Sequence, residues 1–163
     1  MTTRDFLSYW LPETAEGERA QGGDLLHCAS SQYSRLRRGD TVWIVTVRPG
    51  GLLRLLGCVP VARVVNQAQA ARILKCDPDE LWDAHYHVIA DPQRAQPLAD
   101  VPLGRIAGDL QFMGSGKSDR LNPVQGRVKA ESLKKMRQLT AESAAALRRV
   151  WEAKLLLLGF GAL

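Results

Sequence analysis

The sequence predicts an α+β fold, in which a small curved sheet or open barrel of about five to six mostly antiparallel strands has helices at its flanks. The first observation is a hairpin pattern, because two β-branched and apolar runs, 41–47 and 52–65, flank the turn sequence RPGG. The second is a pair of helical patterns with capping residues before them, at 67–75 and 141–158. Strands in succession with helices between them are typical of this class.

The N-terminal part predicts two short strands with a loop between them. The run FLSYWL (6–11) is apolar with three aromatic residues and predicts a buried strand. Residues 12–24 are polar with three glycines and predict a loop, and residues 25–29 predict a second short strand. Ser30 or Ser31 then caps a predicted short helix that ends at Gly39.

The hairpin is the clearest local prediction. TVWIVTV (41–47) is β-branched and apolar almost throughout, which predicts a strand buried on both faces. Residues 52–65 predict its long antiparallel partner, in which Gly57 and Pro60 indicate a bulge or bend.

The rest of the chain predicts mainly helices. Asn66 is the expected cap of a helix to Lys75, and Pro78 is expected to open a helical turn with Asp77 before it. Residues 84–90 alternate as a strand does. Residues 131–139 predict a helix.

The final helix begins after Thr140 and ends at Gly159, with Leu147, Trp151 and Leu155 on one face. We expect residues 1–163 to form one domain of which 140–160 is an added C-terminal helix, because a chain of 163 residues is long enough for one core and short for two.

Charge and cysteine content limit the classes of protein. The net charge of +5 is uneven, since residues 105–163 hold 11 Lys and Arg against 5 Asp and Glu, whereas residues 1–104 are nearly neutral. A basic segment on a neutral body favours a polyanion partner, most often nucleic acid. Three cysteines without a CxxC pair exclude a disulfide scaffold and a zinc finger and favour a reducing cytoplasm. No apolar run approaches the length of a membrane span, so we expect no membrane partner.

The motifs associated with catalysis, metals and nucleotides are incomplete. His85 and His87 are expected on one strand face, but no further residue with metal-ligand spacing accompanies them. The sequence GSGKS (114–118) lacks the glycine of a phosphate-binding loop, because Gln111 stands at that position. Cys28 is expected to be a small buried residue. We therefore expect no catalytic residue, no metal and no cofactor.

Aromatic residues at strand ends point to base recognition. Trp10, Trp82, Tyr86 and Phe112 each lie at or near the end of a predicted strand. A protein that binds an exposed or flipped base needs flat apolar walls for stacking and a few polar groups for the base edge. Trp43 and Trp151, by contrast, are expected in the core.

The order of these motifs resembles the EVE and YTH domains of the PUA-like superfamily over residues 6–140. The matching residues are Tyr9-Trp10-Leu11, Gly39-Asp40, Val42, Gly50-Gly51, Gly57, Val61, the RLNP sequence at 120–123 and the MRQLT sequence at 136–140. The resemblance implies a PUA-like open barrel that recognises modified bases in nucleic acid. His27 stands near the place where YTH domains carry a cage tryptophan, so the resemblance does not specify N6-methyladenine.

Together these observations predict a non-catalytic reader that binds DNA or RNA and takes a modified or flipped base into a pocket at the barrel mouth. The expected pocket residues are Trp10, His27, Ser30, Trp82, Tyr86 and Phe112. The expected contacts to the nucleic-acid backbone are Lys117, Arg120, Asn122, Arg127 and Lys129.

Two alternatives remain open. One is an enzyme acting on a small molecule or nucleotide derivative in the same cavity, with His85 or His87 as acid or base and Asp83, Asp91 or Asp109 nearby in space. The other is an interaction module of a restriction or toxin–antitoxin system, in which the leucine-rich C-terminal helix binds a protein partner.

Overall fold

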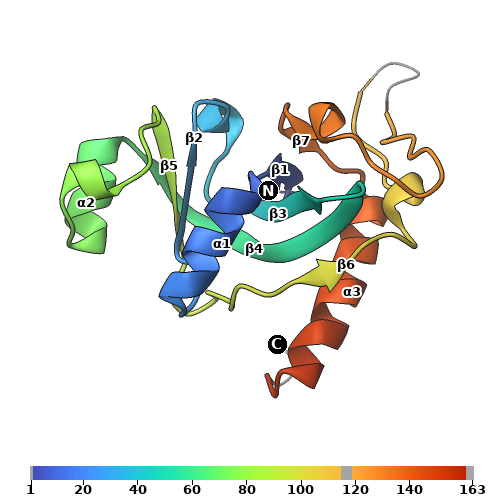
Figure 1. Cartoon of the computed structure of the whole chain (residues 1–163). Helices are drawn as coiled ribbons and strands as arrows, with labels where there is room; N and C mark the ends of the chain where they lie inside the picture. The colour runs from blue at the N-terminus through green and yellow to red at the C-terminus, as the bar shows by residue number, and fades with distance from the viewer. Residues whose placement is uncertain (1, 115–118, 161–163) are drawn as a thin grey trace.

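Seven strands pair into one sheet in the computed structural model, which describes residues 2–114 and 119–160 (Figure 1). The strands are β1 (Asp5–Tyr9), β2 (His27–Ser30), β3 (Thr41–Arg48), β4 (Leu52–Val65), β5 (Tyr86–Ala90), β6 (Val101–Pro102) and β7 (Arg137–Gln138). The three helices are α1 (Pro12–Gln21), α2 (Gln67–Leu74) and α3 (Ala141–Leu157). The α+β class predicted from the sequence is confirmed.

The β3–β4 hairpin is the centre of the sheet, as the sequence predicts. Gly50 and Gly51 make the turn with φ of 86° and 76°, in the left-handed region that glycine adopts without strain. The register shifts between Ile44 and Val45, opposite Gly57 and Leu55, which is the bulge expected near Gly57. The hairpin therefore twists and curves the whole sheet.

The 14-residue β4 pairs with different strands along its length. Its first part pairs with β6 through Arg54 and Leu55, and its last part pairs with β5 through Val61 to Val65. The sheet order is β2-β5-β4-β3-β1-β7, with β6 beside β4. Neighbouring strands are antiparallel except for β1 and β3, which are parallel.

The sheet is not closed into a barrel. Strand pairing runs from β2 at one end to β7 at the other, and within residues 2–114 and 119–160 no pairing joins β2 to β1 or β7. In the sequence, α1 and the loop after it connect β1 to β2, and these two strands do not pair, so the curved sheet is open between them (Figure 1). The prediction of an open barrel is therefore correct only in the weaker sense of a curved, unclosed sheet.

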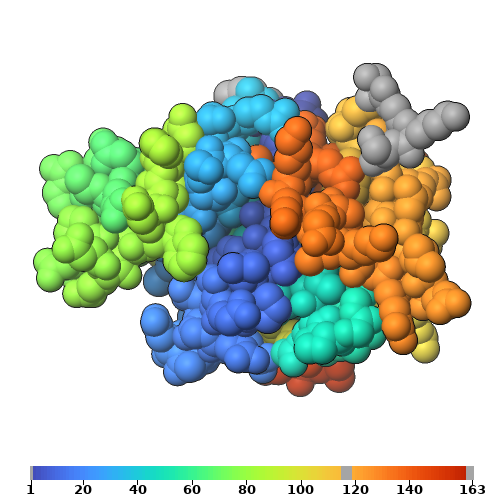
Figure 2. All heavy atoms as spheres, turned by 45° about the horizontal axis from the view of Figure 1, so that its top comes forward, coloured from blue at the N-terminus to red at the C-terminus, as the bar shows by residue number. Residues whose placement is uncertain are grey.

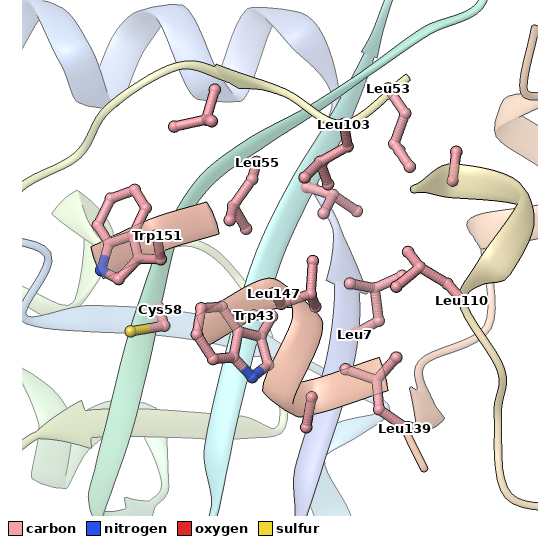
Figure 3. Packing of buried hydrophobic residues seen from close by; sticks show 14 of the residues in the cluster. Leu7, Trp43, Leu53, Leu55, Cys58, Leu103, Leu110, Leu139, Leu147 and Trp151 are labelled. Atoms are coloured by element: carbon pink, nitrogen blue, oxygen red, sulfur yellow. The ribbon is translucent and has the colours of Figure 1, made fainter. Parts of the chain in front are cut away.

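Two hydrophobic clusters cover the two faces of the sheet. The cluster on the α3 side contains Trp43, Leu147 and Trp151, which lie at 1%, 0% and 2% exposure (Figure 3). The cluster on the α1 side contains Phe6 and Tyr33. Alternate residues of β3 point into each cluster, which is why this strand reads as continuously apolar.

The α3 helix matches its prediction. The Thr140 side chain accepts a hydrogen bond from the Ser143 backbone N–H, which caps the first turn. Leu147, Trp151 and Leu155 form the buried stripe. The α2 helix is equally regular, because Asn66 and Gln69 form a reciprocal capping box.

The loop predicted at 12–24 is wrong, because residues 12–21 form α1. Pro12 starts the helix at a position where its missing N–H is not needed, and Glu, Ala, Arg and Gln are good helix formers. The sequence of this helix has no periodic apolar pattern, because Ala15 is its one buried residue. The glycines Gly22 and Gly23 end the helix.

Two further helix predictions are wrong. Residues 131–139 form a 3₁₀ turn, Ala130–Leu133, and then β7, whose Arg137 pairs with Leu7 of β1. Residues after Ser30 form only a 3₁₀ turn, Tyr33–Arg35. In both places tertiary contacts with β1 and the α1-side cluster override local propensity.

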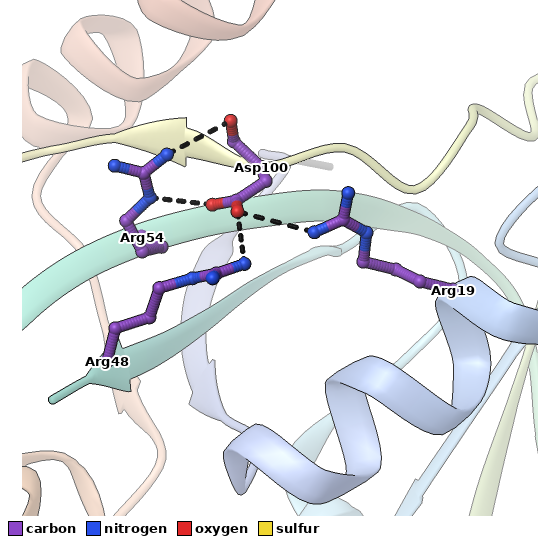
Figure 4. A network of polar contacts seen from close by, with 4 residues as sticks. All are labelled: Arg19, Arg48, Arg54 and Asp100. Carbon is purple, nitrogen blue, oxygen red and sulfur yellow. Dashed lines mark hydrogen bonds and ion pairs between the residues drawn. The ribbon is translucent and has the colours of Figure 1, made fainter.

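Three arginines from different elements hold α1 against the sheet through one carboxylate (Figure 4). Asp100, just before β6, binds Arg19 of α1, Arg48 of β3 and Arg54 of β4, with 2.6 Å between Arg54 Nε and Asp100 Oδ1. The arginines are partly exposed, so each pair contributes on the order of 0–1 kcal/mol. Of these three pairs, Arg19–Asp100, at 3.3 Å, is the one that involves α1.

Candidate functional site

A cavity of about 1110 Å³ lies where the sheet is open, between β1 and β2. Its walls are the end of β1 with Trp10, the Thr14–Glu18–Gln21 face of α1, and β2 with the turn after it. The segment that leads into β5 supplies residues 80–85. In Figure 2 this light green segment lies beside the blue residues of α1 and β2. The cavity thus exists because α1 spans the gap between two unpaired strands.

Four of the six predicted pocket residues line this cavity: Trp10, His27, Ser30 and Trp82. The two tryptophans differ, because Trp10 is 9% exposed and packs in the α1-side cluster, whereas Trp82 is 61% exposed. Trp10 is therefore both a core residue and a wall, and Trp82 is a free wall at the rim. Tyr9 and Tyr33, which the sequence reasoning did not select, complete the aromatic lining.

Phe112 and Tyr86 do not line the cavity. Phe112 is 3% exposed in the α3-side cluster, and the Arg137 guanidinium lies 3.9 Å from its ring centroid. Its backbone bridges to Leu139, which places it on the far side of the sheet. Tyr86 pairs with Ser30 and packs against the α1-side cluster. The expectation that Phe112 forms a pocket wall is corrected by this burial.

Two histidine rings lie edge to edge and nearly coplanar between the cavity and the protein interior. His27 Nε2 lies 2.8 Å from His87 Nδ1, and the ring planes are 11° apart. His87 Nε2 in turn lies 3.1 Å from the Ala84 carbonyl oxygen. Burial lowers the pKa of His27 to about 4, with a further contribution from His87. Burial likewise lowers the pKa of His87. Both rings are therefore neutral at pH 7.

A buried polar group closes the cavity floor. The Tyr33 hydroxyl lies 2.8 Å from Ser8 Oγ. Burial raises the pKa of Cys28 to about 12. Cys28 is thus a neutral thiol at pH 7, not the thiolate that nucleophilic catalysis needs.

The cavity lining is acidic. Among the residues that the structure describes, it contains Glu18, Asp24, Glu80 and Asp83 and one basic residue, Lys134, which gives a formal charge of −3. Burial raises the pKa of Glu18. This lining repels phosphate groups and admits neutral or cationic parts of a ligand.

Lys134 belongs to the basic segment of the sequence and is held at the rim by Gln32. The Gln32 side chain donates to the Lys134 carbonyl at 2.7 Å and accepts from the Met136 N–H at 2.6 Å. These bonds join residues about a hundred positions apart, so no local pattern marks Gln32 or Lys134 as site residues.

The residues predicted to contact phosphates lie away from the lining. Arg120, Asn122, Arg127 and Lys129 are exposed, and none of them lines the cavity. Arg127 packs against Gly51 at the β3–β4 turn. Lys117 lies outside the described residues. That these side chains contact the nucleic-acid backbone stays a prediction.

The histidine pair that the sequence places on one strand face is not equivalent. His85 precedes β5, is exposed and lines the cavity, whereas His87 is 0% exposed and lies behind His27. Among residues 2–114 and 119–160, no group of three His, Cys, Asp or Glu side chains is placed to hold a metal ion. In the same residues, no helix has both the length and the apolar character needed to cross a bilayer.

Comparisons with known proteins give no family for this chain. It matches no protein-family model, and a search of the curated proteins finds no match either.

Proposed function

We propose that the chain is a nucleic-acid reader that takes a modified or flipped base of DNA or RNA into the cavity between β1 and β2. The observation that carries the proposal is the combination of a cavity of about 1110 Å³, the Trp10 and Trp82 walls, and the polar groups of His27 and Ser30. Ligand sites of this kind typically measure about 300–1,000 Å³ and combine aromatic walls with a few polar groups.

The acidic lining of the cavity and the basic residues outside it would bind different parts of the ligand. The described residues of the lining carry a formal charge of −3, whereas the whole sequence carries +5, so the basic residues lie mostly outside the lining that the structure describes. A base enters the cavity and the phosphates stay outside, next to Lys134 and the exposed basic residues that follow Asp119. Phosphate contacts outside and base contacts inside are the usual division in such complexes.

A PUA-like relationship and a cytoplasmic location are parts of the same proposal. The curved sheet, its central hairpin and the cavity beside Trp10 support the first. The second is supported by three free cysteines, Cys28, Cys58 and Cys76.

Binding to labelled single-stranded and duplex oligonucleotides, unmodified or with one methylated adenine or cytosine, tests the proposal. We expect a preference for one modified or unpaired base and an affinity that falls steeply with salt. The Trp82→Ala variant should lose about 1–3 kcal/mol of binding to the preferred ligand, the value of one stacked base. Met113→Ala, at an equally exposed position outside the lining, is the matched control.

The same panel separates the reader from the enzyme. A reader releases the oligonucleotide unchanged, as chromatography of the recovered strand would show. A chemically altered oligonucleotide would overturn the proposal. Affinities that are the same with and without the modification and the Trp82 substitution would also overturn it.

A protein contact through the end of α3 is a second proposal, carried by a separate observation. Leu156, Leu157, Leu158 and Phe160 are 62%, 83%, 46% and 46% exposed. Several exposed large apolar residues close together in the chain are typical of a contact site. The measurement is molar mass by light scattering for the whole chain and for Leu157→Glu. A concentration-dependent mass that Leu157→Glu abolishes supports it, and a monomer at all concentrations counts against self-association.

A further inference from the structure

Hydrogen bonding fixes the proton positions of the two paired histidines. The Ala84 carbonyl can only accept, so His87 Nε2, at 3.1 Å, carries a proton. A neutral imidazole has one N–H, so His87 Nδ1 is an acceptor. His27 Nε2, at 2.8 Å from it, must then donate. The remaining nitrogen of His27, Nδ1, carries a lone pair and no proton.

His27 Nδ1 reaches solvent, and His27 is a residue of the cavity wall. No hydrogen bond to this atom is formed by residues 2–114 or 119–160, and no buried side-chain nitrogen or oxygen in them lacks a partner. An unbonded Nδ1 must therefore reach solvent, and His27 lies in the cavity wall. Burial and the His87 ring, which lower the pKa of His27 to about 4, keep this nitrogen unprotonated at pH 7.

We infer that His27 is a specificity-determining residue whose Nδ1 accepts a hydrogen bond from the ligand, so that the cavity selects a base edge with an N–H donor. The inference rests on the proposed function and names the ligand class more narrowly. Amino groups and ring N–H groups satisfy Nδ1, and an amino group that carries one methyl still has one hydrogen to donate. An analogue in which the last hydrogen is replaced by methyl leaves Nδ1 without a partner, which is costly in a partly buried site.

Ala84, His87 and His27 thus form a relay that begins at a backbone carbonyl and ends in the cavity. His87 is a positioning residue, since it is buried and acts through His27. The relay joins β2 to β5 and to the segment before it. The orientation of His27 Nδ1 therefore depends on the pairing of β2 with β5.

The tautomers are tested first, on the ligand-free protein. Nitrogen-15 NMR of the imidazole rings at pH 7 should show Nε2–H and an unprotonated Nδ1 for both His27 and His87. A proton on Nδ1 of either ring overturns the relay, whatever the protein binds.

The ligand class is tested with paired nucleosides that differ in one N–H. The pairs are N6-methyladenosine with its N6,N6-dimethyl analogue, cytidine with its N4,N4-dimethyl analogue, and uridine with its N3-methyl analogue. The donor-bearing member of the best-bound pair should bind about tenfold more tightly. Equal binding of both members overturns the inference while leaving base binding itself intact.

A substitution separates the lost hydrogen bond from the bulk of the added methyl. His27→Phe keeps a flat ring and removes the acceptor, so the ratio between the two members should fall to about one. If the ratio persists in His27→Phe, steric exclusion explains it and the inference is wrong. If the NMR result holds and no nucleoside or oligonucleotide binds, the proposed function fails and the ligand class fails with it.

Discussion

The two faces of the sheet are covered in different ways by a helix each. On the α3 side, Leu147, Trp151 and Leu155 fill the space against the sheet, and the cluster is apolar throughout. On the α1 side, the helix buries only Ala15, and its Thr14–Glu18–Gln21 face lines the cavity. On one face the helix itself supplies large apolar side chains, whereas on the other the sheet and the turn after β2 supply them and the helix adds polar side chains that line the cavity.

The difference shows what a site of this type requires from the helix beside it. A helix with a stripe of large residues closes its face to ligands and provides stability. A helix with one small buried residue contributes little packing, and one of its contacts with the rest of the fold is the Arg19–Asp100 ion pair (Figure 4). The α3 helix thus serves stability and the α1 helix lines the cavity, so substitutions on the two faces can be compared.

Trp151→Ala should have the largest effect, and it should affect stability alone. The side chain is 2% exposed and its indole N–H donates to Gln96. We expect the free energy of unfolding to fall by about 3–5 kcal/mol, measured by chemical denaturation. Leu157→Ala, on an 83% exposed residue of the same helix, should change it by less than about 0.5 kcal/mol. Reduced ligand affinity in Trp151→Ala under folding conditions would contradict the separation of the two faces.

Trp10→Ala should lower both stability and binding, because this residue belongs to the core and to the cavity wall. We expect a loss of about 3 kcal/mol in the free energy of unfolding, at the low end for a tryptophan because water can occupy the enlarged cavity. Denaturation and ligand titration of the same preparation measure the two effects. Loss of stability with unchanged ligand preference would assign Trp10 to the core alone.

The α1 side should also be the pH-sensitive face, since the only histidines of the chain, His27, His85 and His87, lie in or behind the cavity wall. The pKa of His27 is about 4 when folded and about 6.5 when unfolded. Between these values the unfolded state binds the extra proton, so stability falls as the pH drops from 6.5 to 4. We expect His27 to contribute on the order of 2–3 kcal/mol to this loss.

Comparing the unsubstituted protein with the His27→Gln variant isolates the contribution of His27, because the variant keeps the other titrating groups. Unfolding free energies of both proteins at pH 7 and pH 4 supply the measurement. The loss on acidification should be smaller in the variant, and an identical loss in both would show that His27 titrates normally.

The smallest expected effect concerns Lys134, a basic residue of the lining. Lys134→Ala should leave the free energy of unfolding within about 0.5 kcal/mol, because the side chain is exposed. It should reduce the slope of the logarithm of the oligonucleotide affinity against the logarithm of the salt concentration by about one, the value expected for one phosphate contact. Arg149→Ala, on the exposed face of α3, is the charge-matched control and should leave the slope unchanged.

Elements with strong local signals could be predicted from the sequence. The β3–β4 hairpin has β-branched strands and a glycine turn, and α3 has a cap and an apolar stripe. The α1 helix could not be predicted, because a helix that buries only Ala15 shows no apolar period. The β7 strand is two residues long and exists only through its pairing with β1.

The site could be predicted only in part, for a related reason. Aromatic residues at strand ends pointed to Trp10 and Trp82, but the same reasoning included Phe112, whose burial depends on Leu139 on the far side of the sheet. The contacts that define the site join distant parts of the chain, as His27 with His87 and Gln32 with Lys134 do. Such pairings come from strand order and have no signature in local sequence.

The parallel pairing of β1 with β3 has a consequence for how the cavity opens. Parallel neighbours need a crossover connection, and here the connection contains α1 and β2, so it is also the cavity wall. The hairpin amides are buried in the sheet, whereas α1 buries one residue, so local opening of α1 costs far less than global unfolding. Backbone amides of α1 should therefore exchange with solvent deuterium quickly in the empty protein and more slowly once the cavity is filled, which makes this helix a built-in reporter of occupancy.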